Sequence, residues 1–336
     1  MNRFDYLRPA SVEEAVRAAA APGAAYLAGG TNLLDLMKVG VATPEVLIDV
    51  TRLPGLDAIE DQPDGGLRIG AMARNSDVAR HASVLSRFPA VAEALLSGAS
   101  AQLRNAATVG GNILQRPRAA LSGGLAGEPR EHAVLGWTES CRSVHPSDFC
   151  VPLAALGAAV EIAGPGGTRR AALSDLFALP EGAGEAAPTL APGELLTALF
   201  LPGEAAAFAG NARYVKLRER TSFAFALVSA AAALRIEGGT IAEARLALGG
   251  VAHKAWRAEA AEALLAGAAP TAAIFGEAAA LALADARPSG ENAFKIELAR
   301  RTAARALALA AAGTPARMPA LPASPFDAEY GAPAHV

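Results

Sequence analysis

The N-terminal part of the chain alternates between amphipathic and short apolar stretches. Ser11 followed by Glu14 forms a capping-box pattern, which predicts a helix over residues 11–20. The apolar run "AAYLAGG" predicts a short strand, and the apolar residues of "NLLDLMK" recur at helical spacing. A second strand, "EVLIDV", ends at the turn "TRLPG". The pattern therefore predicts an α-β-α-β unit across residues 1–55.

A second unit is predicted over residues 56–205. The stretch "GLRIGAM" (66–72) predicts a strand, Ser76 is expected to cap a helix, and "FPAVAEALLSGAS" predicts a further helix. The apolar segment "AATVGGNIL" (106–114) is interrupted by a glycine pair. Residues 115–131 are rich in Gly, Pro and Arg, and they lack any periodicity, so a loop is expected there.

The C-terminal part differs in composition and in the order of its elements. A helix beginning near Ser147 and a strand come first, and the stretch "PGEAAAFAGNA" (202–212) then marks a boundary. The segments "RYVKLRE", "FALVSAAAALRI" and "TIAEARLALGGV" predict three strands. Helical periodicity follows in three stretches, 257–267, 271–285 and 291–311. This order predicts a compact α+β domain over residues 206–312, followed by an irregular Pro- and Ala-rich tail over 313–336.

Composition and charge narrow the class of protein. A chain of 336 residues with 52% hydrophobic and 19% charged residues is typical of a soluble globular protein of two or three domains. A net charge of −3 and a pI near 6.0 argue against nucleic-acid binding. We find no run of ~18 strongly apolar residues that could span a membrane. The start "MNRFDYLRPASVEEAV" lacks the apolar core of a signal peptide, so we expect a cytoplasmic protein.

Two glycine pairs are the strongest candidates for a ligand-binding site. Gly29-Gly30 and Gly110-Gly111 each follow an apolar run and precede a polar residue and another apolar run. Such a pair permits positive φ and close approach to the backbone, and N–H groups in such a turn converge on negative charge. A cofactor pyrophosphate could therefore lie across both turns. Further hydrogen bonds would come from the side chains of Thr31, Asn32, Thr108 and Asn112.

The alternative is an ordinary glycine-rich turn between a strand and a helix, which is common in proteins. Neither pair is a Walker loop, because no Gly-Lys-Ser/Thr sequence follows, and neither matches Gly-x-Gly-x-x-Gly. The chain also lacks a Gly-x-Ser-x-Gly or His-Glu-x-x-His motif, which argues against hydrolase chemistry. The order of His132, Cys141, His145 and Cys150 does not match a usual zinc spacing.

Five collinear blocks across about residues 1–310 carry a specific resemblance: "YLAGGTNLLDLMK", "LRNAATVGGNILQ", "HPSDFCVPLAALGAAVEI", "YVKLRERTSFAFALVSAAAAL" and "ARLALGGVAHKAWRA". They resemble the FAD-binding (medium) subunit of the molybdenum hydroxylases, a group that includes xanthine dehydrogenases, aldehyde oxidoreductases and carbon monoxide dehydrogenases. The subgroup that looks most similar is the flavin subunit of three-subunit bacterial aldehyde oxidoreductases. The resemblance implies a two-lobed FAD-binding domain of the vanillyl-alcohol-oxidase type, followed by a small α+β domain with a three-stranded sheet.

The resemblance also implies a role for each block. The segment that wraps the FAD pyrophosphate would comprise Leu27, Ala28, Gly29, Gly30, Thr31, Asn32, Leu33 and Leu34. The segment that closes the site from the second lobe would supply Thr108, Gly110, Gly111 and Asn112. Asp148 would contact a polar part of the cofactor, Leu195 or Leu196 would pack near the flavin, and Lys216 would approach the cofactor. Without the resemblance, Asp148 would be interpreted as an acidic residue that caps a helix, and Leu195 and Leu196 as core residues of a strand. Lys216 would be interpreted as a solvated lysine.

The chain departs from the subgroup in one respect. The region after the second glycine pair carries a cysteine-rich insertion with a [4Fe–4S] cluster in the subgroup, whereas residues 115–131 contain no cysteine here. Cluster ligation normally needs thiolates. We therefore predict that the chain binds FAD and no iron–sulfur cluster, and that Cys141 and Cys150 are buried structural thiols.

The resemblance implies an electron-transfer subunit without a general acid or base of its own. An aldehyde, xanthine or another N-heterocycle would be hydroxylated at a molybdenum cofactor on a large partner subunit. Electrons would then pass through [2Fe–2S] clusters on a small partner to FAD, and from FAD to a small-molecule acceptor. Two alternatives for the function stay open: a stand-alone flavin-dependent oxidase of the same fold, and an assembly subunit that binds no flavin. Export of the complex with a signal-bearing partner also stays open beside the cytoplasmic location.

Overall fold

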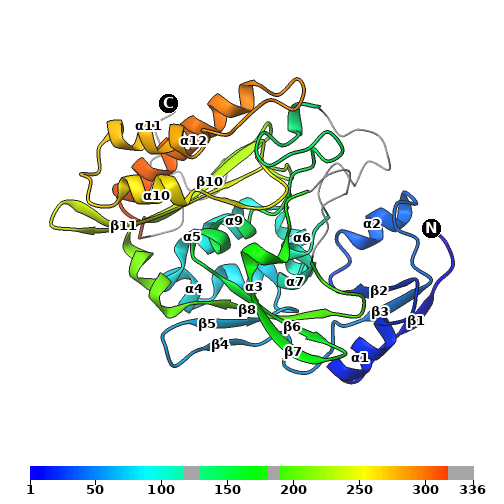
Figure 1. Cartoon of the computed structure of the whole chain (residues 1–336). Coiled ribbons are helices and arrows are strands. Elements are labelled where there is room, and N and C mark those ends of the chain that lie inside the picture. Colours follow the sequence, from blue (N-terminus) through cyan, green and yellow to red (C-terminus); the bar gives the residue numbers. More distant parts are fainter. Residues whose placement is uncertain (117–128, 181–188, 317–336) are drawn as a thin grey trace.

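A computed structural model describes residues 1–116, 129–180 and 189–316 of the chain. The strands of these residues form three sheets, and Figure 1 shows one sheet near the N-terminus, a second at the base and a third beneath the C-terminal helices. Within the described ranges, no helix combines the length and the apolar character that crossing a membrane requires. The predicted loop over 115–131 and the tail over 313–336 lie mostly outside the described residues.

The first sheet is parallel, with the strand order β1 (Asp5–Leu7), β3 (Val46–Asp49), β2 (Ala24–Leu27). Its helices are α1 (Val12–Ala19) and α2 (Leu33–Lys38). The Ser11 side chain accepts a hydrogen bond from the Glu14 N–H (3.2 Å), as the capping-box pattern predicts. The predicted α-β-α-β order is present as α1, β2, α2 and β3, and the structure adds the strand β1 before it, which the sequence analysis did not predict.

The second sheet is antiparallel, with the strand order β4 (Ile59–Asp61), β5 (Leu67–Gly70), β8 (Leu195–Leu201), β6 (Ala159–Gly164), β7 (Gly167–Ala172). The central strand β8 is buried along its whole length, and Leu196 lies in it. Figure 1 shows helices between this sheet and the third one. Those of the described residues are α3 (Asn75–Arg80), α4 (Ala82–Arg87), α5 (Pro89–Ser97), α6 (Ala101–Ala106), α7 (Val109–Ile113) and α9 (Cys150–Ala155).

Two details of the second unit differ from the prediction. Ser76 does not cap a helix, because α3 begins one residue earlier and the Arg74 carbonyl accepts its first hydrogen bond. The segment over 106–114 contains the short helix α7, for which Thr108 is the N-cap. The starts of α3 and α7 lie next to each other, because the Asn75 N–H donates to the Ala107 carbonyl (3.0 Å).

The third sheet is antiparallel, with the strand order β12 (Trp256–Arg257), β11 (Thr240–Gly249), β10 (Val228–Glu237), β9 (Ala212–Leu217). Three helices follow: α10 (Glu259–Leu265), α11 (Ala272–Leu281) and α12 (Phe294–Ala311). The three predicted strands are present, and the two-residue β12 is a fourth that no periodicity could indicate. Along β10, Ala230 and Ala232 pack toward α12, whereas Ala231 and Ala233 pack toward the helices of the second unit. Alanine therefore allows close packing on both faces.

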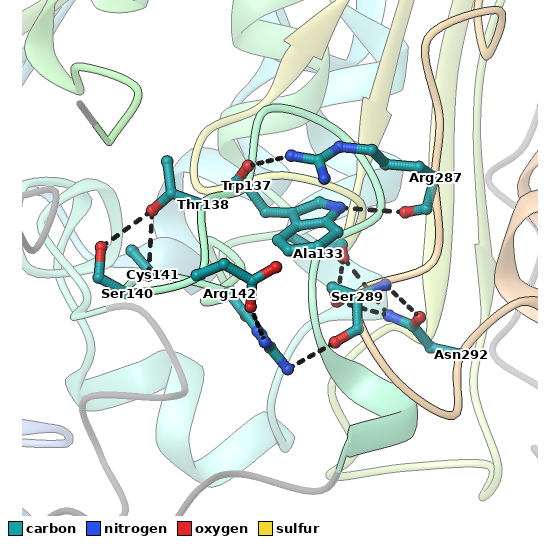
Figure 2. A network of polar contacts seen from close by, with 10 residues as sticks. Ala133, Trp137, Thr138, Ser140, Cys141, Arg142, Arg287, Ser289 and Asn292 are labelled. Carbon is teal, nitrogen blue, oxygen red and sulfur yellow. Dashed lines mark hydrogen bonds and ion pairs between the residues drawn. The ribbon is translucent and has the colours of Figure 1, made fainter. Parts of the chain in front are cut away.

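Residues 129–146 precede much of the second sheet in the sequence but pack against the third. Figure 2 shows Trp137 beside Arg287: the indole N–H donates to the Arg287 carbonyl (3.1 Å), and the guanidinium donates to the Trp137 carbonyl (3.0 Å). The buried Asn292 and Lys295 donate to main-chain carbonyls of the same segment. These contacts between distant parts of the sequence join the second unit to the C-terminal one.

The domain bounds 1–55, 56–205 and 206–312 stay a prediction. Short 3₁₀ helices complete the described elements at Pro129–Glu131, Leu173–Leu176 and Gly203–Asn211.

Candidate functional site

A cavity of about 450 Å³ lies between α2, α5, α6, the segment 146–149 and the loop residues 223–225. In Figure 1, α2 faces α6 and α7 across this region. Ligand pockets in proteins commonly have volumes of about 300–1,000 Å³. The cavity is therefore large enough to be a cofactor site.

The cavity brings together predicted residues from three separate blocks of the sequence. Thr31, Asn32, Asn112 and Asp148 line it. The other predicted residues are not part of its lining: Leu27, Ala28, Gly29, Gly30, Leu33, Leu34, Thr108, Gly110, Gly111, Leu196 and Lys216. Leu196 is a buried core residue of β8, the alternative that its sequence pattern favoured. Contact of any of these residues with a cofactor stays a prediction.

The turn after β2 depends on its first glycine pair. A Cβ atom on Gly29 would lie 2.1 Å from the Ala106 carbonyl oxygen, so this turn contacts the end of α6 backbone to backbone. Gly30 has a φ of +71°, the left-handed conformation that glycine tolerates. Within the described chain, the N–H groups of residues 29–32 have no hydrogen-bond acceptor, and these residues are half-buried. A short row of N–H donors is therefore available next to the cavity.

The second glycine pair lies in a short helix, and its contact with a cofactor stays a prediction. Gly110 and Gly111 lie inside α7 and do not have positive φ. The Gly110 N–H donates to the Ala71 carbonyl (2.7 Å), and the Gly111 N–H donates to the Thr108 hydroxyl oxygen (3.2 Å). These N–H groups already have partners within the protein. Of the residues predicted in this segment, Asn112 lines the cavity and Thr108, Gly110 and Gly111 do not.

Asp148 belongs to a buried polar cluster. Its Oδ1 accepts a hydrogen bond from the Tyr214 hydroxyl (2.5 Å), and its Oδ2 accepts one from Lys216 Nζ (2.7 Å). The side chain of Lys216 is only 3% exposed, so it is not the solvated lysine of the alternative interpretation. Burial and the Asp148 carboxylate raise the pKa of Tyr214 well above its usual value. The carboxylate of Asp148 is thus held at the cavity wall by two donors rather than capping a helix.

A buried arginine lines the cavity, together with the carboxylates of Asp35 and Asp148. Arg104 lines the cavity, is 8% exposed and donates to the Gly98 carbonyl (2.7 Å). Arg218 donates to the Ser97 carbonyl (2.9 Å) at the end of the same helix, α5. Burial, and then the positive charges of Arg80 and Arg218, lower the pKa of Arg104. None of the three arginines forms an ion pair in the part of the chain that the structure describes. The guanidinium of Arg104 is therefore available to a negatively charged group of a ligand, whereas Arg80 and Arg218 are not part of the cavity lining.

Several residues that line the cavity were missed by the sequence interpretation, Arg104 among them. Asn75, Phe223 and Phe225 all line it. Phe223 has a φ of +48°, which is strained for a residue with a Cβ atom. Phe225 lies in the quoted block "YVKLRERTSFAFALVSAAAAL", but nothing in the pattern of this block assigns its aromatic residues to a site. The position of Asn75 depends on the pairing of its N–H with Ala107, which is a tertiary contact.

His145 precedes the cavity segment and is buried in its neutral form. Its Nε2 donates to the Ile113 carbonyl (3.1 Å), and its Nδ1 accepts a hydrogen bond from the Ser147 N–H (3.3 Å). Burial lowers the pKa of His145 from 6.5 to about 4. Protonation of Nδ1 would also place two donors against each other. The His145 side chain therefore ties α7 to the start of the Pro146–Asp148 segment only while it is neutral.

This burial predicts a loss of stability in mild acid. Since the pKa of His145 is lower in the folded state, the unfolded chain binds the extra proton between pH 6.5 and 4. Stability from this residue is complete above pH 6.5 and falls by about 3 kcal/mol as the pH drops to 4. Urea unfolding at pH 7, 5.5 and 4.5 measures it, with His145→Gln as the control without this titration. Parallel pH profiles of the two proteins would contradict the prediction.

Comparison with known proteins gives the family. The FAD binding domain in molybdopterin dehydrogenase matches residues 2–204, and the CO dehydrogenase flavoprotein C-terminal domain matches residues 213–310. The chain is 45% identical to the Escherichia coli aldehyde oxidoreductase FAD-binding subunit PaoB, over 93% of this chain and 99% of that subunit. It is 33% identical to the carbon monoxide dehydrogenase medium chain of Hydrogenophaga pseudoflava, over 91% and 96% of the two chains.

Solved structures agree with this assignment. A chain of the Hydrogenophaga pseudoflava carbon monoxide dehydrogenase superposes with a TM-score of 0.75 at 32% identity, covering 93% of this chain and 98% of that one. A chain of quinoline 2-oxidoreductase from Pseudomonas putida 86 gives a TM-score of 0.74 at 26% identity, with the same coverage. The resemblance stated from the sequence is confirmed. The chain belongs to the family of FAD-binding flavoprotein subunits of the molybdopterin dehydrogenases.

Proposed function

We propose that this chain binds FAD in the cavity and serves as the electron-transfer subunit of a multi-subunit molybdenum hydroxylase of the aldehyde or xanthine/N-heterocycle dehydrogenase type. The observation that carries the proposal is the cavity itself, where Thr31, Asn112 and Asp148 from three distant blocks meet. Membership of the family and 45% identity to an aldehyde oxidoreductase FAD-binding subunit support it. When bound, FAD would accept electrons singly and deliver them as pairs.

The residues of this chain would bind and orient the cofactor, and none would act as a general acid or general base. The free N–H groups of residues 29–32 are suited to the diphosphate, because backbone donors in a turn favour negative charge. Arg104 supplies a buried positive charge, and its attraction for an anionic group is stronger there than in water. The cluster of Asp148, Lys216 and Tyr214 is fixed by its own hydrogen bonds, so it offers a rigid wall to the cofactor.

The same proposal names the partners. A large subunit with the molybdenum cofactor would oxidise the substrate, and a small subunit with [2Fe–2S] clusters would pass electrons to FAD. The final acceptor would be a small molecule, and the complex would be cytoplasmic. We propose that the chain holds no [4Fe–4S] cluster, because residues 115–131 have no cysteine. Residues 117–128 of this stretch lie outside the described residues.

Purification of the chain alone tests the proposal. We expect a yellow protein that keeps close to one FAD per chain after desalting and contains no iron. A colourless protein that binds no added FAD would contradict it and favour the assembly subunit. Adding candidate aldehydes or N-heterocycles without partner subunits should leave the flavin oxidised. Rapid bleaching under these conditions would instead identify a stand-alone oxidase.

A further inference from the structure

The loop between β9 and β10 contributes exposed aromatic side chains to the cavity lining. Phe223 and Phe225 both belong to that lining, and they are 58% and 41% exposed. Val39, directly after α2, lines the same cavity and is 71% exposed. One exposed apolar residue is ordinary on a protein surface, whereas exposed apolar residues gathered in a cavity are typical of a surface that a ligand covers.

The loop is held in place at both of its ends. The Leu227 N–H donates to the Leu217 carbonyl (2.9 Å), which closes the base of the loop. Arg218 donates to the Ser97 carbonyl (2.9 Å), which joins the start of the loop to the end of α5. Phe223 keeps its φ of +48°, and strained backbone of this kind is concentrated at ligand sites in proteins. The loop therefore presents its aromatic side chains in a defined position.

These side chains narrow the chemistry of the ligand more than the charges do. Arg104 and the carboxylates of Asp35 and Asp148 all line the cavity, so the charges are of both signs. Aromatic side chains are more selective, because they pack on flat ring systems through their faces and edges. Both phenylalanines retain accessible surface, so a ring in the cavity can reach them. The loop thus fits a ligand that carries a flat, largely apolar ring.

We infer that Phe223 and Phe225 bind the isoalloxazine ring of FAD. The inference rests on the proposed function. FAD carries two flat rings, and the isoalloxazine is the one that has to stay within reach of an electron acceptor. Phe223 is more than half exposed, so a ring packed against it lies at the mouth of the cavity. The adenine ring has no such requirement, and the loop is therefore assigned to the isoalloxazine.

The variant Phe223→Gly removes the aromatic ring and keeps the course of the loop, because glycine readily adopts a φ of +48°. Without FAD, its urea midpoint should stay close to that of the wild type, since the lost side chain is exposed. Its dissociation constant for FAD should rise about tenfold, which corresponds to one lost aromatic contact. Calorimetric titration with FMN should show the same loss, and titration with ADP should show none.

The variant Phe223→Trp adds a spectroscopic readout that a merely structural role would not change. Indole is a better electron donor than a phenyl ring, so packing of the tryptophan on the isoalloxazine should give bound FAD a long-wavelength charge-transfer band. Phe225→Ala should also weaken FAD binding, and it keeps the experiment decisive if the Phe223 variants do not fold. Phe4→Gly removes an exposed phenylalanine that is not part of the cavity lining and should leave each affinity unchanged.

The outcomes separate the inference from the proposed function. Wild-type affinity for FAD in both Phe223→Gly and Phe225→Ala would overturn the inference. A loss confined to ADP would overturn it as well, because it would place the adenine ring at this loop. Failure of the wild-type chain itself to bind FAD would instead overturn the proposed function.

Discussion

Replacing Gly29 with alanine should abolish FAD retention and lower the free energy of unfolding by about 3 kcal/mol. The added Cβ would lie 2.1 Å from the Ala106 carbonyl oxygen and 2.8 Å from its carbonyl carbon. Both atoms are backbone, so relief requires the turn after β2 to move away from the end of α6. That movement would displace the N–H groups of residues 29–32 from the cavity. Flavin absorbance after desalting and urea unfolding measure the two effects.

Gly276→Ala provides the matched control for Gly29→Ala. Gly276 lies inside α11, and a Cβ there would meet nothing within 4 Å in the described part of the structure. Alanine at a helix interior position is more favourable than glycine by about 0.5–1 kcal/mol, so this variant should be yellow and slightly more stable. A Gly29→Ala protein with wild-type flavin content and stability would show that the two segments are not in contact.

The glycine pairs show how far sequence patterns could locate the site. The alternation of apolar and polar residues placed the first turn correctly, because that turn directly joins β2 to α2. The second pair was expected to form a similar turn, because it too follows an apolar run and precedes a polar residue and another apolar run. In the structure, capping by Thr108 and the close approach of Gly110 to Ala71 stabilise a short helix there. Tertiary packing therefore outweighed local propensity.

The remaining differences also arise from contacts between distant residues. Strand β12 has only two residues, and it exists because Leu248 of β11 pairs with Trp256. Asn75 of α3 and Arg104 of α6 both line the cavity. A hydrogen bond from the Asn75 N–H to the Ala107 carbonyl joins the start of α3 to the end of α6. Local periodicity identifies helices and strands, but it does not specify which helix ends meet. The family resemblance supplied the block residues, whereas α3 lay outside all the quoted blocks.

Asp148→Asn should be the second strongly damaging substitution. The asparagine keeps an oxygen that can accept from the Tyr214 hydroxyl, but it removes the negative charge opposite Lys216. The Lys216 side chain is 3% exposed, so its ammonium group would stay buried without a counter-charge. Breaking a buried ion pair from one side commonly destabilises a protein by about 3–5 kcal/mol. We expect urea unfolding to show a loss of this size, together with weaker FAD binding, because Asp148 lines the cavity.

The double variant Asp148→Asn/Lys216→Met distinguishes loss of the ion pair from general damage to the wall. Methionine fills much of the volume of lysine without a charge, so the pair of substitutions leaves no isolated ion in the protein. We expect the double variant to be more stable than Asp148→Asn alone, with a coupling energy above about 1 kcal/mol between the two sites. Strictly additive losses would mean that the ammonium of Lys216 does not depend on Asp148. Its remaining acceptor, the Ser97 carbonyl at 3.2 Å, would then satisfy it by itself.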